Sequence, residues 1–473
     1  MSTVRPVRIV MALLAATAGF AGRAAAQTND EIFPQFQWNF ASPGARANAM
    51  GQAFIGVADD ATAATTNPAG LVNLTRPQVY LEYKNTDLRV QRLANADSFF
   101  TGQPTTFSTN VNSPSFLNIA WPVGRGVAVA FTRHEFLNQQ ESFQLATRAF
   151  PNTLSGSTVL VGFPVTGSDN FNGVSYAASV AAAPSKLLSV GLTVSFNHLD
   201  AKSEAERFND IAGPTFCNPT CTQANISDVK TSSVIANQTS INQTNNAVAF
   251  TIGAIVKPAP WVSVGFNYAK GPSFTVRENK ATNPGFVGFP NPCCGTNQPL
   301  VTSPGFPVTV PINVPDRFGV GVAVRPLPRL LFAADAVRIN YSSLAKNVTL
   351  IFDEGTTVGS HLTIDNVTEI HVGGEVNVSA GANPVFVRGG VFTNPNHTLK
   401  FTGPIDETTI PFGNETYTAL YDTLPRDTEV YGTVGAGVAV GLHLQLDVAY
   451  VAKVAPSAAP GRRDLIVSAA IRF

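Results

Sequence analysis

Few side chains in this sequence have the types and spacing of a catalytic or metal-binding site. The six histidines form no H-E-x-x-H pair, and the chain has no G-x-S-x-G, Walker or dinucleotide-binding glycine pattern. A rim site built on His134 or His198 with distant acids is the catalytic alternative that stays open. The sequence therefore predicts neither an enzyme nor a metal or other cofactor.

The four cysteines are the other groups with chemistry of their own, and they are Cys217, Cys221, Cys293 and Cys294. Their C-x3-C and C-C spacings do not match a zinc site, and no histidine lies close to either pair in sequence. In an exported protein such cysteines form disulfides, with free thiols as the alternative.

Composition narrows the class of protein that must position these residues. The chain has 473 residues, with 31 basic and 31 acidic side chains. Only 13% of its residues are charged, against about 25% in ordinary soluble proteins, while 44% are hydrophobic. This balance gives no electrostatic basis for binding nucleic acid and argues against disorder. A large soluble all-β protein or a membrane-embedded one remains.

The first 26 residues have the layout of a signal peptide. Arg5 and Arg8 precede an apolar stretch over residues 9–20, and Ala24-Ala25-Ala26 offers a cleavage site. The apolar stretch is too short for a transmembrane helix, which needs about 20 residues. We therefore expect residues 1–26 to be removed on export.

From residue 77 to 473 the sequence predicts fourteen strands. Short segments with period-2 alternation come in six pairs joined by tight turns, between one opening and one closing strand. The expected strands are Val79–Tyr83, Leu117–Trp121, Val127–Phe131, Val174–Val180, Val190–Phe196, Val248–Val256, Val262–Tyr268, Phe318–Val324, Leu330–Tyr341, Ile370–Val378, Val385–Phe392, Val430–Val440, Leu444–Tyr450 and Leu465–Phe473.

The two faces of these strands differ sharply in charge. One parity is apolar and the other carries every charge in the spans, except that Asp335 and Arg338 fall on opposite parities of one strand, whose faces stay unassigned. A charge facing lipid costs about 2–4 kcal/mol at the bilayer midplane, so the apolar parity is predicted to face lipid. The charged parity holds Lys257, Arg317, Glu369, Glu375, Arg388, Glu429, Asp447, Asp464 and Arg472.

Connection lengths distinguish this arrangement from a soluble sandwich. Tight turns alternate with long connections in one phase throughout, as in bacterial outer-membrane barrels. We therefore predict a 14-stranded antiparallel transmembrane β-barrel in the outer membrane, in contact with its lipid and with both termini periplasmic. Its last strand ends at Phe473, where the barrel-assembly machinery is expected to recognise it. The long connections lie near residues 85–112, 135–172, 199–246, 271–313, 342–365, 393–427 and 452–462.

Residues 27–76 do not alternate and are a candidate plug for the lumen. They contain Gly44-Ala45-Arg46, Met50-Gly-Gln-Ala-Phe54, Ala58-Asp-Asp-Ala61 and Asn67-Pro68-Ala69-Gly70 in that order. This segment resembles the N-terminal hatch of the FadL/TodX family of outer-membrane channels for long-chain fatty acids and aromatic hydrocarbons. The resemblance extends to the fourteen-stranded barrel.

The resemblance implies passive uptake of a hydrophobic small molecule by a monomeric channel. In this family the hatch closes the lumen, and substrate leaves sideways through a gap at a kink in the third strand, here residues 127–135. Asn67, Pro68, Ala69 and Gly70 are then the hatch motif expected to meet that strand. The alternatives are a turn within the plug, a general porin, and a barrel that serves as a structural or secretion partner.

Entry is expected through a hydrophobic groove between the third and fourth outer loops, which also carry the four cysteines. If one pair of cysteines bonds to the other, the disulfides staple the groove walls; two local bridges are the open alternative. The groove candidates are Phe274, Phe286, Val287, Phe289, Leu300, Val301 and Phe306.

A fatty-acid carboxylate would need a cation in the lumen. Arg317, Arg388 and Lys257 have the required parity, with His371 as a further candidate. Ordinary ion pairs with the acidic residues of the same parity are the equal alternative, and an uncharged hydrocarbon needs no cation.

Overall fold

The computed structural model describes residues 38–473 with gaps at 94–103, 146–147, 152–157, 162–164, 210–233, 286–297, 304–305, 346–349, 353–355, 359–361, 380, 382, 399, 404–426 and 457–460. The predicted signal peptide, the four cysteines, Phe286, Val287 and Phe289 lie outside these residues. Among the described residues, no helix has both the length and the apolar character to cross a membrane.

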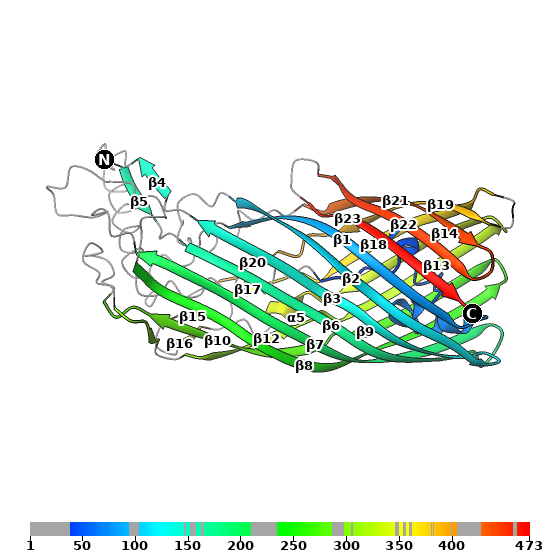
Figure 1. Cartoon of the computed structure of the whole chain (residues 1–473), viewed down its shortest axis with the longest axis horizontal. Coiled ribbons are helices and arrows are strands. Elements are labelled where there is room, and N and C mark those ends of the chain that lie inside the picture. The colour runs from blue at the N-terminus through cyan, green and yellow to red at the C-terminus, as the bar shows by residue number, and fades with distance from the viewer. Residues whose placement is uncertain are drawn as a thin grey trace.

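Fourteen of the described strands close into an antiparallel barrel (Figure 1). Each strand pairs with the next along the chain, and the last pairs with the first through Gln78 and Arg472. In order around the wall they are β1 (Gln78–Leu93), β2 (Pro104–Gly124), β3 (Val127–Leu145), β6 (Val165–Ala182), β7 (Leu188–Asn209), β8 (Val234–Ala259), β9 (Val262–Lys270), β13 (Arg317–Leu327), β14 (Leu330–Ile339), β18 (Val367–Asn377), β19 (Val385–Asn394), β21 (Glu429–Val440), β22 (Leu444–Ala455) and β23 (Arg463–Arg472).

The outward parity is apolar, as the alternation predicts. Phe131 is 66% exposed and Val248 is 69% exposed, while neighbouring positions point inward. The strand with unassigned faces follows the same rule, because Asp335 is 3% exposed and Arg338 lies on the outer face. A closed wall satisfies the backbone groups that lipid cannot.

Several strands extend beyond their predicted ends into connections expected to be loops. β1 continues to Leu93, β3 to Leu145 and β7 to Asn209. Outside the bilayer the outer face of the wall meets water and carries polar residues, so these extensions lose the apolar outward parity that marks the membrane-spanning part. The exposed Asn110 and Asn112 of β2 show this composition.

The connection between β9 and β13 forms a hairpin of its own. β10 (Ser273–Thr282) pairs with β12 (Val308–Asn313) and β11 (Val301–Thr302). Smaller elements among the described residues are β4 (Arg148–Pro151), β5 (Thr158–Val161), β15 (Leu350–Phe352), β16 (Thr356–Val358), β17 (Leu362–Thr363), β20 (Lys400–Phe401) and α5 (Ser342–Ala345).

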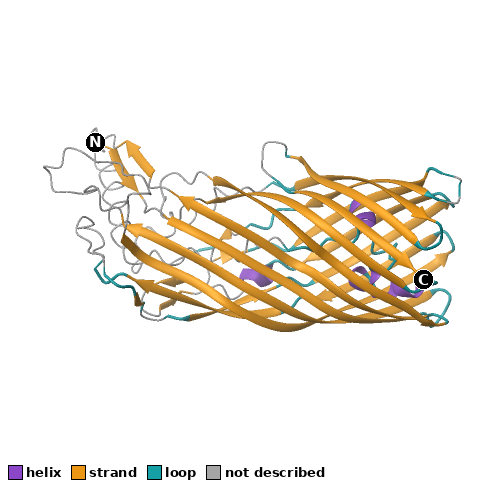
Figure 2. Cartoon of the chain, in the orientation of Figure 1, coloured by secondary structure: helices purple, strands orange, loops and turns teal. Residues whose placement is uncertain are grey.

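Residues 38–76, called the plug segment below, lie inside the barrel near the end that carries the short turns and the C-terminus (Figure 2). They form α3 (Ala45–Ala49), α4 (Ala63–Thr66) and the 3-10 helix η2 (Pro68–Asn73). α3 packs on β19, β21, β22 and β23, while η2 packs on β2, β3, β6, β7 and β8. The small inward residues of the wall leave the space that these helices fill.

Candidate functional site

The barrel wall opens between β2 and β3. The β2–β3 ladder runs only from the Gly124–Val127 pair to the Phe116–His134 pair, although both strands continue outward. Beyond that point β2 pairs only with β1, and β3 pairs only with β6. The β3–β6 register shifts between Glu135 and Leu137, so Phe136 is the extra residue of a bulge. A bulge bends its strand, and this bulge lies where β3 and β2 cease to pair.

The start of the plug segment occupies this opening. The backbone N–H of Asn39 donates to the Phe136 carbonyl at 2.8 Å, and its side-chain Nδ2 donates to the Glu135 carbonyl at 3.0 Å. Lys84 Nζ donates to Asn39 Oδ1 at 3.3 Å. Trp38-Asn39-Phe40, called the strap below, therefore satisfies carbonyls that β2 leaves unpaired.

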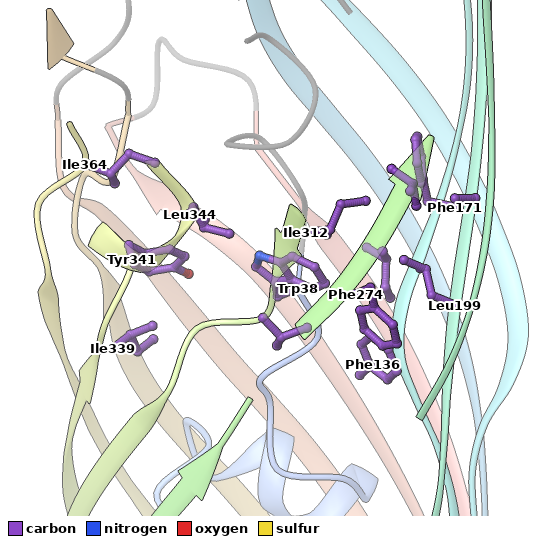
Figure 3. Packing of buried hydrophobic residues seen from close by; sticks show 14 of the residues in the cluster. Trp38, Phe136, Phe171, Leu199, Phe274, Ile312, Ile339, Tyr341, Leu344 and Ile364 are labelled. Carbon is purple, nitrogen blue, oxygen red and sulfur yellow. The ribbon is translucent and has the colours of Figure 1, made fainter. Parts of the chain in front are cut away.

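An apolar cluster fills the lumen behind the opening (Figure 3). Phe136 points inward at 7% exposure and stacks on Phe274 of β10, with ring centroids 6.1 Å apart. Trp38 of the strap stacks on Phe136 at 6.4 Å. This lumen cluster comprises Trp38, Phe136, Leu137, Phe171, Leu199, Ala201, Ile241, Phe274, Val276, Ile312, Val314, Ile339, Tyr341, Leu344, Ile364 and Val367.

Polar groups border the opening on its inner side. Ser113 Oγ donates to Glu135 Oε1 at 2.6 Å, and Ser115 Oγ donates to Glu82 Oε1 at 2.5 Å. Glu82 also accepts the Gly44 N–H, so it fixes the plug segment to β1. The opening therefore combines an apolar lumen with a rim of carboxylates that are already hydrogen-bonded.

Two small cavities flank Phe40 of the strap. The first is about 40 Å³ and is lined in part by His134, Arg317 and Thr66. The second is about 70 Å³ and is lined in part by Tyr341 and His397. An empty cavity of about 150 Å³ is needed to hold benzene, so neither accepts a hydrocarbon while the strap is in place.

The first cavity is lined by groups of both charges, Arg317 and Glu369. Arg317 donates to the Phe40 carbonyl at 3.1 Å and its guanidinium lies 4.5 Å from the Phe40 ring centroid. Among the described residues, no carboxylate oxygen lies within 4 Å of Arg317 in an ion pair. His134 Nε2 and Thr66 Oγ1 are buried and have no hydrogen-bond partner within the described ranges of the chain. Buried polar groups are normally paired, so this cavity has unused capacity for a polar ligand.

The other three predicted lumen cations have hydrogen-bond partners of their own, although His371 also lines the first cavity. Arg388 lies between Glu375 and Asp447, at 2.7 Å from each. His371 Nε2 lies 3.1 Å from Glu369, and Lys257 Nζ donates to Asn73 Oδ1 at 2.5 Å. Arg388 and His371 therefore have the ion-pair role that the sequence left as the alternative.

The hatch motif contributes Pro68, Ala69 and Gly70 to η2, which contacts β3, while its Asn67 side chain faces β8. Asn67 is fully buried, and its Nδ2 donates to the carbonyls of Ile55 at 3.0 Å and of Ala254 in β8 at 3.3 Å. A Cβ built on Gly253 would lie 2.0 Å from Asn67 Oδ1, so this glycine makes room for the amide. Residues of η2 do contact β3, but the Asn67 side chain does not reach the opening; the strap does.

Charged contacts anchor the rest of the plug segment. Asp335 accepts the N–H groups of Phe54 at 2.6 Å and Ile55 at 2.8 Å. Arg46 pairs with Glu375 at 2.8 Å and with Asp59 at 2.5 Å. The bonds to Asp335 and Glu375 join the plug segment to β14 and β18, and the Arg46–Asp59 pair lies within the segment.

The predicted loop groove is only partly a loop. Phe274 lies in β10, within the predicted connection between β9 and β13, and its side chain is in the lumen cluster at 1% exposure. Val301 is 51% exposed in β11, Leu300 precedes it, and Phe306 lies over Lys280 with 5.7 Å between the ring centroid and Nζ. Burial lowers the pKa of His397, which stacks on Tyr341 at 4.1 Å beyond the end of β19.

Sequence reasoning missed the strap and the bulge. The available signal was Phe136-Leu137, where two adjacent buried apolar residues break the alternation of β3. Nothing local marked Trp38 and Asn39, because their partners lie about a hundred residues away. In the described part of the chain, no group of three or more metal-ligating side chains is placed to hold an ion.

A family profile described as outer membrane protein transport protein (OMPP1/FadL/TodX) matches residues 35–395. The chain belongs to this family. It is accordingly an outer-membrane β-barrel with the fold of hydrophobic-compound transporters. No curated protein sequence matches it.

Solved structures similar to this FadL/TodX-family chain agree on the fold. A Pseudomonas aeruginosa FadL homologue has 14% sequence identity and a TM-score of 0.59, with 92% of this chain and 98% of that chain covered. The Ralstonia pickettii toluene transporter TbuX has 14% identity and a TM-score of 0.55, covering 92% and 99%. The Pseudomonas putida toluene transporter TodX has 11% identity and a TM-score of 0.54, also covering 92% and 99%.

Proposed function

We propose that this chain is a channel for passive uptake of hydrophobic small molecules, namely long-chain fatty acids or aromatic hydrocarbons, with lateral release between β2 and β3. The observation that carries the proposal is an apolar lumen cluster directly behind an opening in the wall. Each CH₂ group gains about 0.8 kcal/mol on leaving water, so lateral release into the bilayer avoids an aqueous step.

The strap is the element that must move. Trp38 and Phe40 fill the place of an apolar ligand, and Asn39 closes the edge of β3. A ligand that replaces their apolar contacts compensates for their displacement, so binding and opening are coupled. The residues of the hatch motif, Asn67 to Gly70, hold the plug in place during this movement.

Capture is proposed at the outer loops, where Leu300, Val301 and Phe306 lie beyond the lumen cluster. A carboxylate headgroup would bind Arg317, with His134 and Thr66 supplying the remaining hydrogen bonds. Uncharged hydrocarbons would use only the lumen cluster. The same chain can therefore serve both substrate classes with different affinities.

The remaining parts of the proposal concern the assembly of the barrel and the alternative functions. We propose a non-enzymatic monomer whose last strand, ending at Phe473, is recognised by the barrel-assembly machinery. A general porin is disfavoured, because the plug segment leaves only about 40 and 70 Å³ around Phe40. A role as a secretion partner would require the polar strand extensions rather than the lumen cluster.

The test is uptake of labelled oleate and toluene by a host that lacks its own channel of this type. Heat-modifiable migration first establishes that the barrel is folded in the outer membrane. Uptake above that of the empty-vector host supports the proposal. The matched variant is Phe136→Asp, which places a charge in the lumen cluster, and its uptake is compared with that of the wild type. A folded wild-type barrel that moves neither solute would refute it.

A further inference from the structure

The wall has a second discontinuity, between β8 and β10. The β8–β9 ladder ends at the Phe250–Lys270 pair, and β8 next pairs with β10 at Ile241–Glu278. Residues 242–249 of β8 thus run beside residues 271–277 without a ladder between them. Gly271 and Pro272 separate β9 from β10, and proline cannot donate a ladder hydrogen bond.

Side chains bridge this seam in place of backbone groups. Asn245 Nδ2 donates to the Thr275 carbonyl at 2.7 Å, and the Arg277 N–H donates to Gln243 Oε1 at 2.9 Å. Paired strands lie about 4.8 Å apart, whereas an interposed amide side chain holds the two backbones further apart. The seam is therefore wider than a ladder and is closed by fewer bonds.

The seam leads from the outer edge of the apolar belt to the lumen cluster. On its outer side Val248 is 69% exposed, and the next outward residues along β8, Asn246 and Thr244, are exposed and polar. On its inner side Phe274 and Val276 are 1% and 0% exposed. Phe274 stacks on Phe136, which lies at the β2–β3 opening, so apolar rings connect the two breaks in the wall.

We propose that the β8–β10 seam is a second passage through the wall, through which apolar solutes enter the lumen cluster sideways from the membrane surface, with Gln243 and Asn245 as its gate. This inference rests on the proposed transport function. The gate closes by two side-chain hydrogen bonds, and each such bond contributes only a modest net stabilisation. Regions closed by few bonds open locally more often than intact ladders do.

The experiment uses the full chain with its four native cysteines replaced by serine. A reporter Val276→Cys lies behind the seam, and a matched reporter Leu199→Cys lies in the same cluster on β7. Each reporter is combined with Gln243→Ala/Asn245→Ala or with the control Thr244→Ala, which changes an outward residue between the two gate residues. A bulky, membrane-impermeant maleimide measures access, and toluene and oleate measure uptake.

We expect labelling at position 276 to rise about 25-fold in the double variant, because each of the two hydrogen bonds lost changes an equilibrium by about fivefold. Labelling at position 199 and labelling in the Thr244→Ala chain stay at the parent rate, while uptake rises with access at position 276. Asn245→Gln, which keeps an amide, stays close to the parent.

Two results would overturn the passage while leaving transport intact. One is labelling at positions 276 and 199 that rises equally or not at all in the folded double variant. The other is selective labelling at position 276 with uptake equal to that of a transporting parent. A parent that moves neither solute refutes the proposed function itself, and labelling then shows separately whether the seam opens.

Discussion

Weakening the contacts of the strap should open the channel, and the structure ranks the size of the effect expected from two substitutions. Asn39→Ala removes the 3.0 Å bond to the Glu135 carbonyl and the 3.3 Å contact with Lys84. Its backbone bond to Phe136 remains, so the expected loss is about 1 kcal/mol, or roughly a fivefold increase in strap release. Trp38 is 6% exposed and stacks on two rings, at 6.4 Å from each. Trp38→Ala should cost about 3–5 kcal/mol of strap docking.

The assay is initial uptake of toluene at a concentration well below saturation, in cells with equal amounts of folded barrel. We expect uptake to increase in the order wild type, Asn39→Ala, Trp38→Ala until another step becomes limiting. Trp261→Ala is the control, because this tryptophan is 56% exposed on the outer face beside a short turn. Uptake that is unchanged or lower in folded Trp38→Ala, with Trp261→Ala unaffected, would refute the view that the strap closes the channel.

Four further predictions concern the plug, the cation and assembly. Gly191→Val should displace the plug, since a Cβ at this position lies 2.4 Å from plug backbone, and the entry of a polar antibiotic should then rise. Gly124→Val is the control, because a Cβ at Gly124 meets open space, and it should leave antibiotic entry unchanged. Asp335→Asn should lower plug stability by about 1–3 kcal/mol, measured by limited proteolysis in urea, because a charged acceptor of two N–H groups is lost. Arg317→Gln should reduce oleate uptake about tenfold and leave toluene within about twofold, since only a carboxylate needs the cation; equal losses for both solutes would contradict this. Deletion of Phe473 should lower the amount of heat-modifiable barrel without changing the amount of chain synthesised, as a pulse-labelled blot would show.

Most of the wall follows from period-2 alternation, because the bilayer demands one apolar face from every strand. All fourteen predicted strands are present. The strand predicted over Leu330–Tyr341 is β14, which ends at Ile339, and its inner face is the one on which Asp335 binds plug backbone. The strand extensions escaped prediction, since their outward positions meet water and are polar, which removes the apolar parity. β10 was likewise assigned to a loop, although its alternating burial directs Phe274 inward.

The candidate site was less predictable, because it depends on contacts between distant segments. Strand parity placed both Arg317 and Arg388 in the lumen, but their different roles depend on their neighbours in space. Arg388 is held by two carboxylates, whereas Arg317 faces a cavity. The Asn67 motif could be recognised from sequence, yet its partner in β8 could not. The opening lies at the bulge at Phe136 and is filled by Asn39, and no local pattern connects these two residues.

The central claim is that uptake requires the strap to leave the edge of β3. A chain without its four native cysteines, into which Asn39→Cys and Phe136→Cys are introduced, tests this claim directly. The two new cysteines are joined by a short reducible thiol cross-linker, since the Asn39 N–H contacts the Phe136 carbonyl. Uptake of toluene and oleate is measured before linkage, after it, and after reduction, with each single-cysteine chain as control. The account predicts uptake that stops on linkage and returns on reduction. Uptake that continues unchanged in fully linked barrels would contradict it.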